Sequence, residues 1–265
     1  MTAKQIVARA RGGAAAVVIA SALLGAGCER RADLGSIGDG AASLLWTATF
    51  EPDNLSEWTS DGEGGTYTEN VGTKPSVTSS VVHAGSYAGV VEIAPIASMA
   101  STSYFFRNQP TPLQGYYSAW FYIPSTIVIG SWLSLTHFSG SETGDGNNLV
   151  GIWDVNLYAT PSGGTAAQLY DYMDQVNQRQ PTPVPFPRDA WVQLEVYLEK
   201  ATGPTGAVTV WQDGTQILQR TDVQTVPTEW LQWDAGGASD DISPTPATIY
   251  LDDAAISLTR LGPGS

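Results

Sequence analysis

An all-β protein, built as a single antiparallel β-sandwich, is the fold class that this sequence predicts. Three observations support it: apolar and polar residues alternate along many short segments, Gly and Pro are frequent, and charged residues are few. Of 265 residues, 28 are Gly, 16 are Pro and 14% are charged. A helical bundle needs many Glu, Lys and Arg on its surface, so this composition disfavours one. The length fits one large β domain or two small ones.

The first 27 residues have the pattern of an export signal. Cations at positions 4, 9 and 11 precede an apolar segment, residues 14–24, that is too short to span a bilayer. Small residues then lead into Cys28, the only cysteine of the chain. This arrangement resembles the signal peptide and lipobox of bacterial lipoproteins, in which the cysteine becomes the lipidated first residue. An ordinary secretory leader, cut nearby, is the alternative.

The resemblance implies that lipidated Cys28 anchors the protein to the membrane, on the extracytoplasmic side of a bacterial cell envelope. Residues 28–43 lack apolar periodicity and are expected to form a flexible tether. The jelly-roll domain is expected over residues 44–260, followed by a tail, residues 261–265. A single cysteine also excludes a disulfide framework and a thiolate metal cluster.

The net charge limits the partners. Twelve Lys and Arg stand against 26 Asp and Glu, which gives a formal charge of −14. Such a field repels phosphate backbones, so nucleic acid is not expected as a partner. We expect a monomer.

Period-two alternation is clearest in two segments. Over residues 191–200, Val192, Leu194, Val196 and Leu198 alternate with polar or aromatic residues, and residues 116–123 alternate in the same way. The sequence around Asp213-Gly214 predicts a tight hairpin turn. A single helical turn is possible over residues 171–180. Further strands are expected over residues 45–51, 87–94, 101–109, 131–138, 149–158, 168–173, 207–212, 216–221, 229–233 and 248–258.

Several short motifs resemble the concanavalin A-like jelly rolls. They are Phe50-Glu51-Pro52-Asp53-Asn54-Leu55-Ser56-Glu57-Trp58, Tyr117-Ser118-Ala119-Trp120-Phe121, Trp191-Val192-Gln193-Leu194-Glu195, the segment around Trp211-Gln212-Asp213-Gly214, and Ile249-Tyr250-Leu251-Asp252-Asp253. Within that superfamily the sequence is most similar to laminin-G-like domains and to heparin-lyase-type polysaccharide lyases. The resemblance implies a single jelly roll, a scaffold that hosts lectins, hydrolases and lyases.

The resemblance also implies a saccharide site on the concave sheet face. On the two clearest strands, the side opposite the apolar residues is expected to line that face. Aromatic rings can cover the C–H face of a sugar while amides and carboxylates bind its hydroxyls. Alternatively, these side chains cover a large β surface. The expected carbohydrate-binding residues are Tyr116, Trp120, Tyr122, Trp191, Gln193, Glu195 and Tyr197.

Two enzyme classes are the alternatives to simple binding. A retaining glycosidase needs two carboxyls about 5 Å apart, and the nearest same-face pair, Glu195 and Glu199, would lie roughly 13 Å apart along a strand. A polysaccharide lyase needs a base, an acid and a partner for the uronate carboxylate. Arg107, His137 and Tyr158 could fill these roles, and Tyr170 and Gln193 could complete the pocket. His137 shares its parity with Leu133 and Leu135, which favours a buried, hydrogen-bonded histidine instead.

A structural Ca²⁺ is expected where such jelly rolls tie their first and last strands together. Glu51 and Asp252 or Asp253 match those places, and carboxylate oxygens suit Ca²⁺. Solvated acids at a sheet margin are the alternative.

The sequence therefore predicts a surface-anchored, lectin-like lipoprotein that binds a polysaccharide or oligosaccharide. A neutral glycan suits the acidic field better than an anionic one. The alternatives are a polysaccharide lyase that cleaves a uronate-containing glycan by β-elimination, and an adhesion module that recognises its partner through loops.

Overall fold

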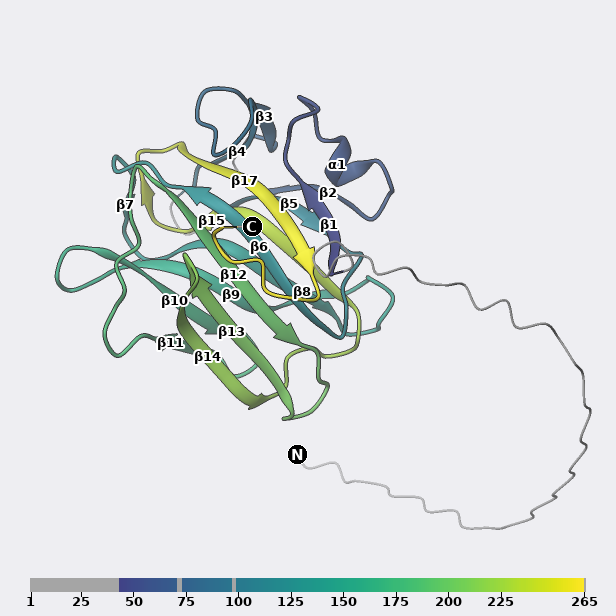
Figure 1. Cartoon of the computed structure of the whole chain (residues 1–265). Coiled ribbons are helices and arrows are strands. Elements are labelled where there is room, and N and C mark those ends of the chain that lie inside the picture. Colours follow the sequence, from purple (N-terminus) through teal and green to yellow (C-terminus); the bar gives the residue numbers. More distant parts are fainter. Residues whose placement is uncertain (1–42, 71–72, 97–98, 265) are drawn as a thin grey trace, which may run out of the picture. The chain divides into compact units, whose positions relative to one another are not determined.

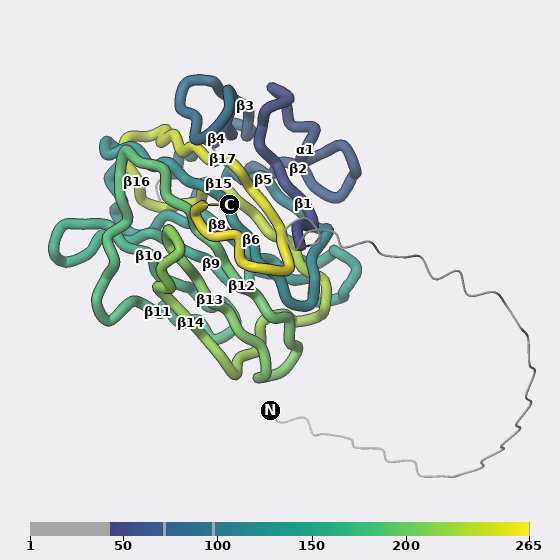
Figure 2. Tube along the Cα trace, viewed as in Figure 1, coloured from purple at the N-terminus to yellow at the C-terminus, as the bar shows by residue number. Residues whose placement is uncertain are grey.

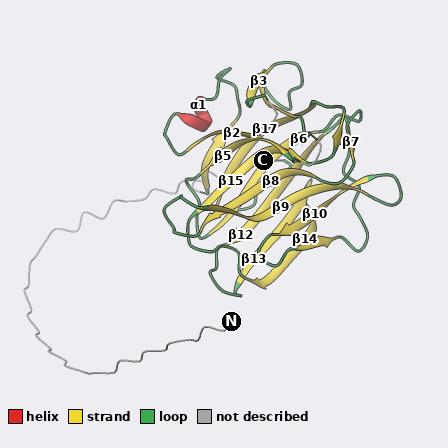
Figure 3. Cartoon of the chain, turned by 180° about the vertical axis from the view of Figure 1, so that it is seen from behind, coloured by secondary structure: helices red, strands yellow, loops and turns green. Residues whose placement is uncertain are grey.

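Two antiparallel β-sheets, packed face to face, make up most of the chain that the structure describes (Figure 1). The computed structural model describes residues 43–70, 73–96 and 99–264. Within them, strands dominate and the helix α1 (Ser56–Thr59) is a single turn (Figure 3). The sandwich predicted from alternation and turn residues is confirmed.

The first sheet has eight strands. In spatial order they are β14 (Thr215–Val223), β13 (Gly206–Gln212), β12 (Trp191–Glu199), β6 (Gln114–Tyr122), β17 (Ala247–Ser257), β4 (Ala88–Ile93) and β3 (Ser76–Thr78), with β1 (Leu44–Ala48) also pairing with β17. The strands β6 and β12, whose alternation is clearest in the sequence, are hydrogen-bonded neighbours at its centre.

The second sheet has seven strands. In spatial order they are β11 (Val176–Arg179), β10 (Thr165–Asp171), β9 (Leu149–Ala159), β8 (Leu133–Ser141), β15 (Leu231–Ser239), β5 (Ser101–Arg107) and β2 (Gly64–Glu69). A short pair, β7 (Val128–Ile129) and β16 (Ile242–Ser243), lies outside both sheets. Strands that follow one another in the sequence are often not hydrogen-bonded neighbours in the sheets. The strands β8, β15 and β5, for example, lie side by side only in the folded chain.

The predicted parity of the central strands is confirmed. Phe121 of β6 and Leu194 of β12 are each 1% exposed and belong to the core between the sheets. Phe105, Phe138 and Trp233 enter the same core from the seven-stranded sheet. The apolar half of each strand thus faces the partner sheet, and the other half forms an outer face.

Turn geometry explains one expectation that holds and one that fails. Asp213 and Gly214 have φ of 47° and 76°, which gives the tight hairpin expected between β13 and β14. The helical turn expected over residues 171–180 does not form. Instead, Gln175 adopts a φ of 55° and the chain turns back as β11, which pairs with β10 from Asp171↔Val176 to Gln168↔Arg179.

The export signal, Cys28 and most of the tether lie outside the described residues. Among the described residues, no helix is both long and apolar enough to cross a bilayer.

Candidate functional site

The residues expected to bind a glycan lie on the outer face of the eight-stranded sheet. Tyr116, Trp120, Tyr122, Trp191 and Tyr197 are half-buried there, on β6 and β12. These side chains lie on the predicted side of the two strands, but other parts of the chain contact them there. The imidazole of His83 stacks on Trp120 with ring centroids 3.9 Å apart, and Trp191 Nε1 donates to the carbonyl of Val82 at 3.0 Å.

The C-terminal segment, residues 258–264, crosses this outer face (Figure 2). Glu195 accepts hydrogen bonds from Arg260 Nε at 3.0 Å and from the backbone N–H of Leu261 at 2.7 Å. Gln193 Nε2 donates to the carbonyl of Gly262 at 2.9 Å. Glu195 is 1% exposed and Gln193 4%. Glu195 is therefore closed to a ligand by the chain itself, which corrects the expectation that it lines an open trough. The glycan role of the five aromatic residues stays a prediction.

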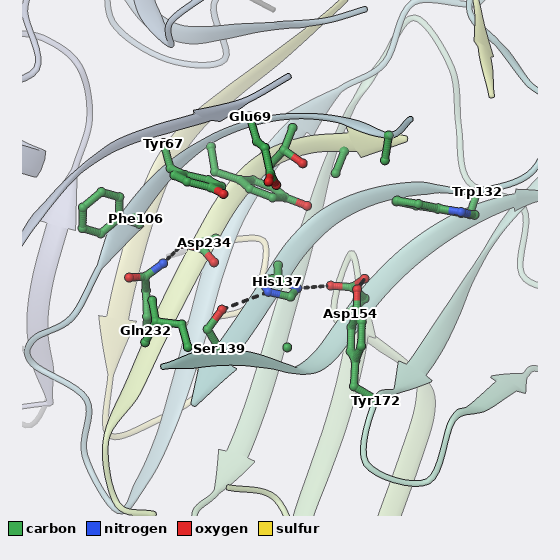
Figure 4. Close-up of a pocket in the computed structure, with 16 residues that line it drawn as sticks. Tyr67, Glu69, Phe106, Trp132, His137, Ser139, Asp154, Tyr172, Gln232 and Asp234 are labelled. Atoms are coloured by element: carbon green, nitrogen blue, oxygen red, sulfur yellow. Dashed lines mark hydrogen bonds and ion pairs between the residues drawn. The ribbon is translucent and has the colours of Figure 1, made fainter. Parts of the chain in front are cut away.

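A cavity of about 570 Å³ opens on the outer face of the seven-stranded sheet (Figure 4), and a second one, of about 520 Å³, lies on the eight-stranded sheet beside His83, Trp120 and Gln193. We call the seven-stranded sheet sheet B, and the cavity of about 570 Å³ on it the sheet-B cavity. Its walls are aromatic and its floor is polar. The aromatic residues are Tyr67, Tyr104, Phe106, Trp132 and Tyr172, and the polar ones are Glu69, Thr102, His137, Ser139, Asp154, Gln232 and Asp234. They come from β2, β5, β8, β9 and β15 and from the loops beside them.

An irregularity in β8 places His137 in this cavity. The register against β9 shifts between Ser134 and Thr136, so that Ser134 opposes Asn156 while Thr136 opposes Val155. A bulge of this kind inserts one residue and reverses which side of the sheet the following residues face. His137 therefore points outward although Leu133 and Leu135 point into the core. The expectation that His137 shares the buried side of these leucines is wrong for this reason.

Hydrogen bonds connect the polar residues of the floor. His137 Nδ1 lies 2.5 Å from Asp154 Oδ1, and its Nε2 lies 3.0 Å from Ser139 Oγ. The hydroxyl of Tyr172 donates to Asp154 Oδ2 at 2.7 Å. Gln232 Nε2 donates to Asp234 Oδ1 at 2.7 Å. In Figure 4, Ser139, His137 and Asp154 lie in one row across the floor of the cavity.

Burial and neighbouring charges shift the protonation of these groups. Burial raises the pKa of Asp234 to about 7, against the lowering effect of His137 and the Gln232 amide. Burial alone would lower the pKa of His137, but the charges of Asp154 and Asp234 and the hydrogen bond to Asp154 raise it above its ordinary value. Burial, with help from Asp154, raises the pKa of Tyr172 and of Tyr104. Both phenols are therefore neutral hydrogen-bonding groups.

The three residues of the lyase hypothesis do not meet. Tyr104 and Phe106 of β5 line the sheet-B cavity, whereas Arg107, the next residue, points to the opposite side. Arg107 is 1% exposed, binds both carboxylate oxygens of Asp61 and lies over the ring of Trp46. Its expected role as partner of a uronate is therefore wrong.

Tyr158 is on the outer side of β9 but does not line the cavity. It lies four residues from Asp154, roughly 13 Å along a strand. The guanidinium of Arg179 covers its ring at 4.3 Å. Of the three lyase residues, only His137 lies in the cavity.

The carboxylates expected to hold Ca²⁺ bind a loop of the chain. Glu51 Oε1 accepts the N–H groups of Ser86 and Tyr87, and Asp252 Oδ2 accepts that of His83. Asp253 Oδ2 lies 2.7 Å from His83 Nδ1. Within the described ranges, no three His, Cys, Asp or Glu side chains are grouped to hold a metal ion. The donors that already face these oxygens do not fit a cation site, and Ca²⁺ binding stays a prediction.

The two-sheet antiparallel jelly-roll fold is shared with several solved structures. One similar structure is an endo-β-1,4-glucuronan lyase from the fungus Trichoderma reesei, with a TM-score of 0.61 and 15% identity over 82% of this chain and 96% of that one. The cellulose-induced protein Cip1 gives a TM-score of 0.57 and 16% identity, over 82% and 99% of the two chains. A marine PL-14 alginate lyase from Aplysia kurodai gives 0.54 and 11%, over 83% and 100%. No protein-family model and no curated protein sequence matches the chain.

Sequence reasoning missed most of the cavity. Gln232 and Asp234 gave no signal in the sequence, because they come from a strand whose pairing with β8 is set by the fold. Ser139 stands two residues after His137 on one strand, so the two share a face. That spacing was the one available clue.

Proposed function

We propose that this protein binds a neutral glycan in the sheet-B cavity. The single observation that carries the proposal is the composition of the cavity wall. Aromatic rings surround a floor of amide, hydroxyl, imidazole and carboxyl groups. A sugar ring suits such a site, because its C–H face packs on aromatic rings and its hydroxyls need fixed donors and acceptors.

The charge of the cavity favours a neutral ligand. Among the described residues that line it, three are acidic, Glu69, Asp154 and Asp234, and none is Lys or Arg. A uronate carboxylate would meet like charges and find no cationic partner, since Arg107 lies on the other side of β5. This observation supports binding of a neutral polysaccharide over the lyase alternative. That alternative predicts an absorbance signal from an unsaturated product when the protein is incubated with polyuronates, and we expect none.

The test compares the two outer faces. Full-length protein is applied to a glycan array, and its affinity for each glycan that it binds there is measured by calorimetry. Tyr67 is 45% exposed and Trp132 is half-buried, so Tyr67→Ala and Trp132→Ala remove cavity walls without emptying the core. We expect each to weaken binding roughly tenfold, or about 1.4 kcal/mol.

Trp120→Ala and Trp191→Ala are matched controls on the eight-stranded sheet and should leave the affinity unchanged. If these two abolish binding while the cavity variants bind normally, the glycan site lies on the face expected from the sequence. Circular dichroism confirms that each variant is folded.

We further propose that Cys28 carries the lipid that anchors the protein in the cell envelope. The export pattern of the first 27 residues supports this. Cys28→Ser should move the protein from the membrane fraction to the soluble fraction of cells, and unchanged fractionation would contradict the anchor.

A further inference from the structure

The row Ser139, His137 and Asp154 has the connectivity of a nucleophile, a base and an orienting carboxylate. Each imidazole nitrogen has one partner: Ser139 Oγ at 3.0 Å from Nε2 and Asp154 Oδ1 at 2.5 Å from Nδ1. Both distances lie at hydrogen-bond length. Such an arrangement is recognised by geometry and not by the order of residues in the sequence.

The partners of Asp154 determine the direction of these bonds. Tyr172 donates its hydroxyl proton to Oδ2, so the carboxylate acts as an acceptor there. A carboxylate can only accept, so the proton between Asp154 and His137 resides on Nδ1. In the neutral imidazole, Nε2 is then an acceptor and Ser139 donates its hydroxyl proton to it. This is the tautomer that lets a histidine take a proton from serine.

The nucleophile faces the cavity, and the neighbouring strands leave room beside it. Ser139 lines the cavity, and its neighbour across β9 is Gly151, which has no side chain. A Cβ at Gly151 would lie 3.1 Å from His137 Cε1, so the glycine leaves space next to the imidazole. On the other side, Gln232 of β15 pairs with Ser139. One of its two amide hydrogens binds Asp234, and the other is a candidate donor to a developing oxyanion.

We propose that the sheet-B cavity is also a serine esterase site, which hydrolyses an O-acyl ester, such as an acetyl group, carried by the glycan. Its substrate class rests on the function proposed above, but its chemistry rests on this row alone. Ser139 Oγ attacks the acyl carbonyl as its proton passes to His137 Nε2, and the alcohol of the glycan leaves with that proton. Water then attacks the acyl-serine, His137 takes and returns a proton, and a carboxylic acid is released. Water is the only co-reactant.

The groups around His137 predict a pH profile. Asp154 of β9, Asp234 of β15, Tyr104 of β5 and Tyr172, just after β10, face it. The two carboxyls raise its pKa, while the phenols stay neutral. Because only neutral imidazole accepts the serine proton, the rate should rise with pH and reach half its maximum above pH 6.5, the ordinary pKa of histidine.

The experiment needs no glycan. Full-length protein is treated with a fluorophosphonate probe, which bonds to an activated serine with loss of fluoride, and the adduct is mapped by mass spectrometry. Hydrolysis of p-nitrophenyl acetate is followed in parallel between pH 5 and pH 9. We expect the adduct on Ser139 and turnover above the buffer rate. Ser139→Ala should abolish both, and His137→Gln should lower labelling about 100-fold or more.

Two further variants separate catalysis from structure. Asp154→Asn tests a positioning residue: it should slow hydrolysis and move the acid limb of the profile to lower pH. Ser134→Ala, on the same strand but outside the residues that line the cavity, is the control and should behave as wild type. If Ser139 is unlabelled, or labelled equally in His137→Gln, the esterase proposal is overturned. Labelling of Ser139 without binding on the glycan array would support the esterase and refute the glycan ligand.

Discussion

Replacing Arg107 with alanine tests whether this buried cation is structural, as its contacts indicate. Its guanidinium binds both carboxylate oxygens of Asp61 at 2.7–2.8 Å, the carbonyl of Gln109 at 2.6 and 2.9 Å and that of Trp58 at 3.2 Å. Without the guanidinium, the carbonyls of Gln109 and Trp58 lose their hydrogen-bond donor. A buried carbonyl without a donor costs about 1–3 kcal/mol of stability, and the packing over Trp46 is lost as well. Asp61 contributes less, since half of its side chain is exposed.

Together these losses should lower the free energy of unfolding by about 3–5 kcal/mol. The melting temperature should then fall by on the order of 10 °C for a domain of this size. Urea unfolding, followed by tryptophan fluorescence, measures the change, with Asp61→Asn as the milder control at about 1 kcal/mol or less. Glycan affinity, measured below the transition, should be unchanged. A stability within 1 kcal/mol of wild type, combined with lost affinity, would refute this reasoning and return Arg107 to a ligand-binding role.

Three more predictions concern other parts of the molecule. Because burial raises the pKa of Asp234 from 3.8 to about 7, the folded state holds this proton more tightly than the unfolded state, and stability should fall as pH rises from about 4 to about 7. Asp234→Asn should flatten that slope in urea titrations at pH 5 and pH 8, and an unchanged slope would contradict it. Glu195→Ala removes the acceptor of Arg260 and Leu261, so unfolding free energy should fall by about 1–3 kcal/mol and trypsin should cut after Arg260 sooner; equal digestion rates would count against the C-terminal contact. If Ca²⁺ binds at Glu51, it should raise the melting temperature of EGTA-treated protein and Glu51→Gln should remove the effect, whereas identical melting curves with and without Ca²⁺ would reject the site.

Much of the fold could be predicted from local pattern. A strand with one buried face must alternate in its own sequence, and β6 and β12 do so without interruption. The strands β2, β3, β7, β11 and β16 were missed because they are short or lack this alternation. The Asp-Gly turn was predictable for a similar local reason, since few other residue pairs accept positive φ at both positions.

The candidate site was less predictable, because it depends on pairing between distant strands. Strict alternation predicts that His137 faces the same side of the strand as Leu133 and Leu135. The bulge against β9 between Ser134 and Thr136 turns His137 to the opposite side. Asp154 and Asp234, which flank His137, are 80 residues apart in the sequence and become neighbours only through the order β9-β8-β15. The burial of Glu195 under Arg260 also depends on where the C-terminal segment crosses the sheet.

By itself, the sequence determined the class of architecture and which half of each regular strand faces the core, because both follow from the period of side chains along a strand. It also determined the acidic net charge that disfavours anionic partners. Tertiary structure alone decided which side chains meet in the sheet-B cavity, and that Arg107 and His137 lie on opposite sides of one sheet. The reason is physical: strand register, bulges and the path of the terminal segment arise from contacts between residues far apart in the chain, and no local pattern records them.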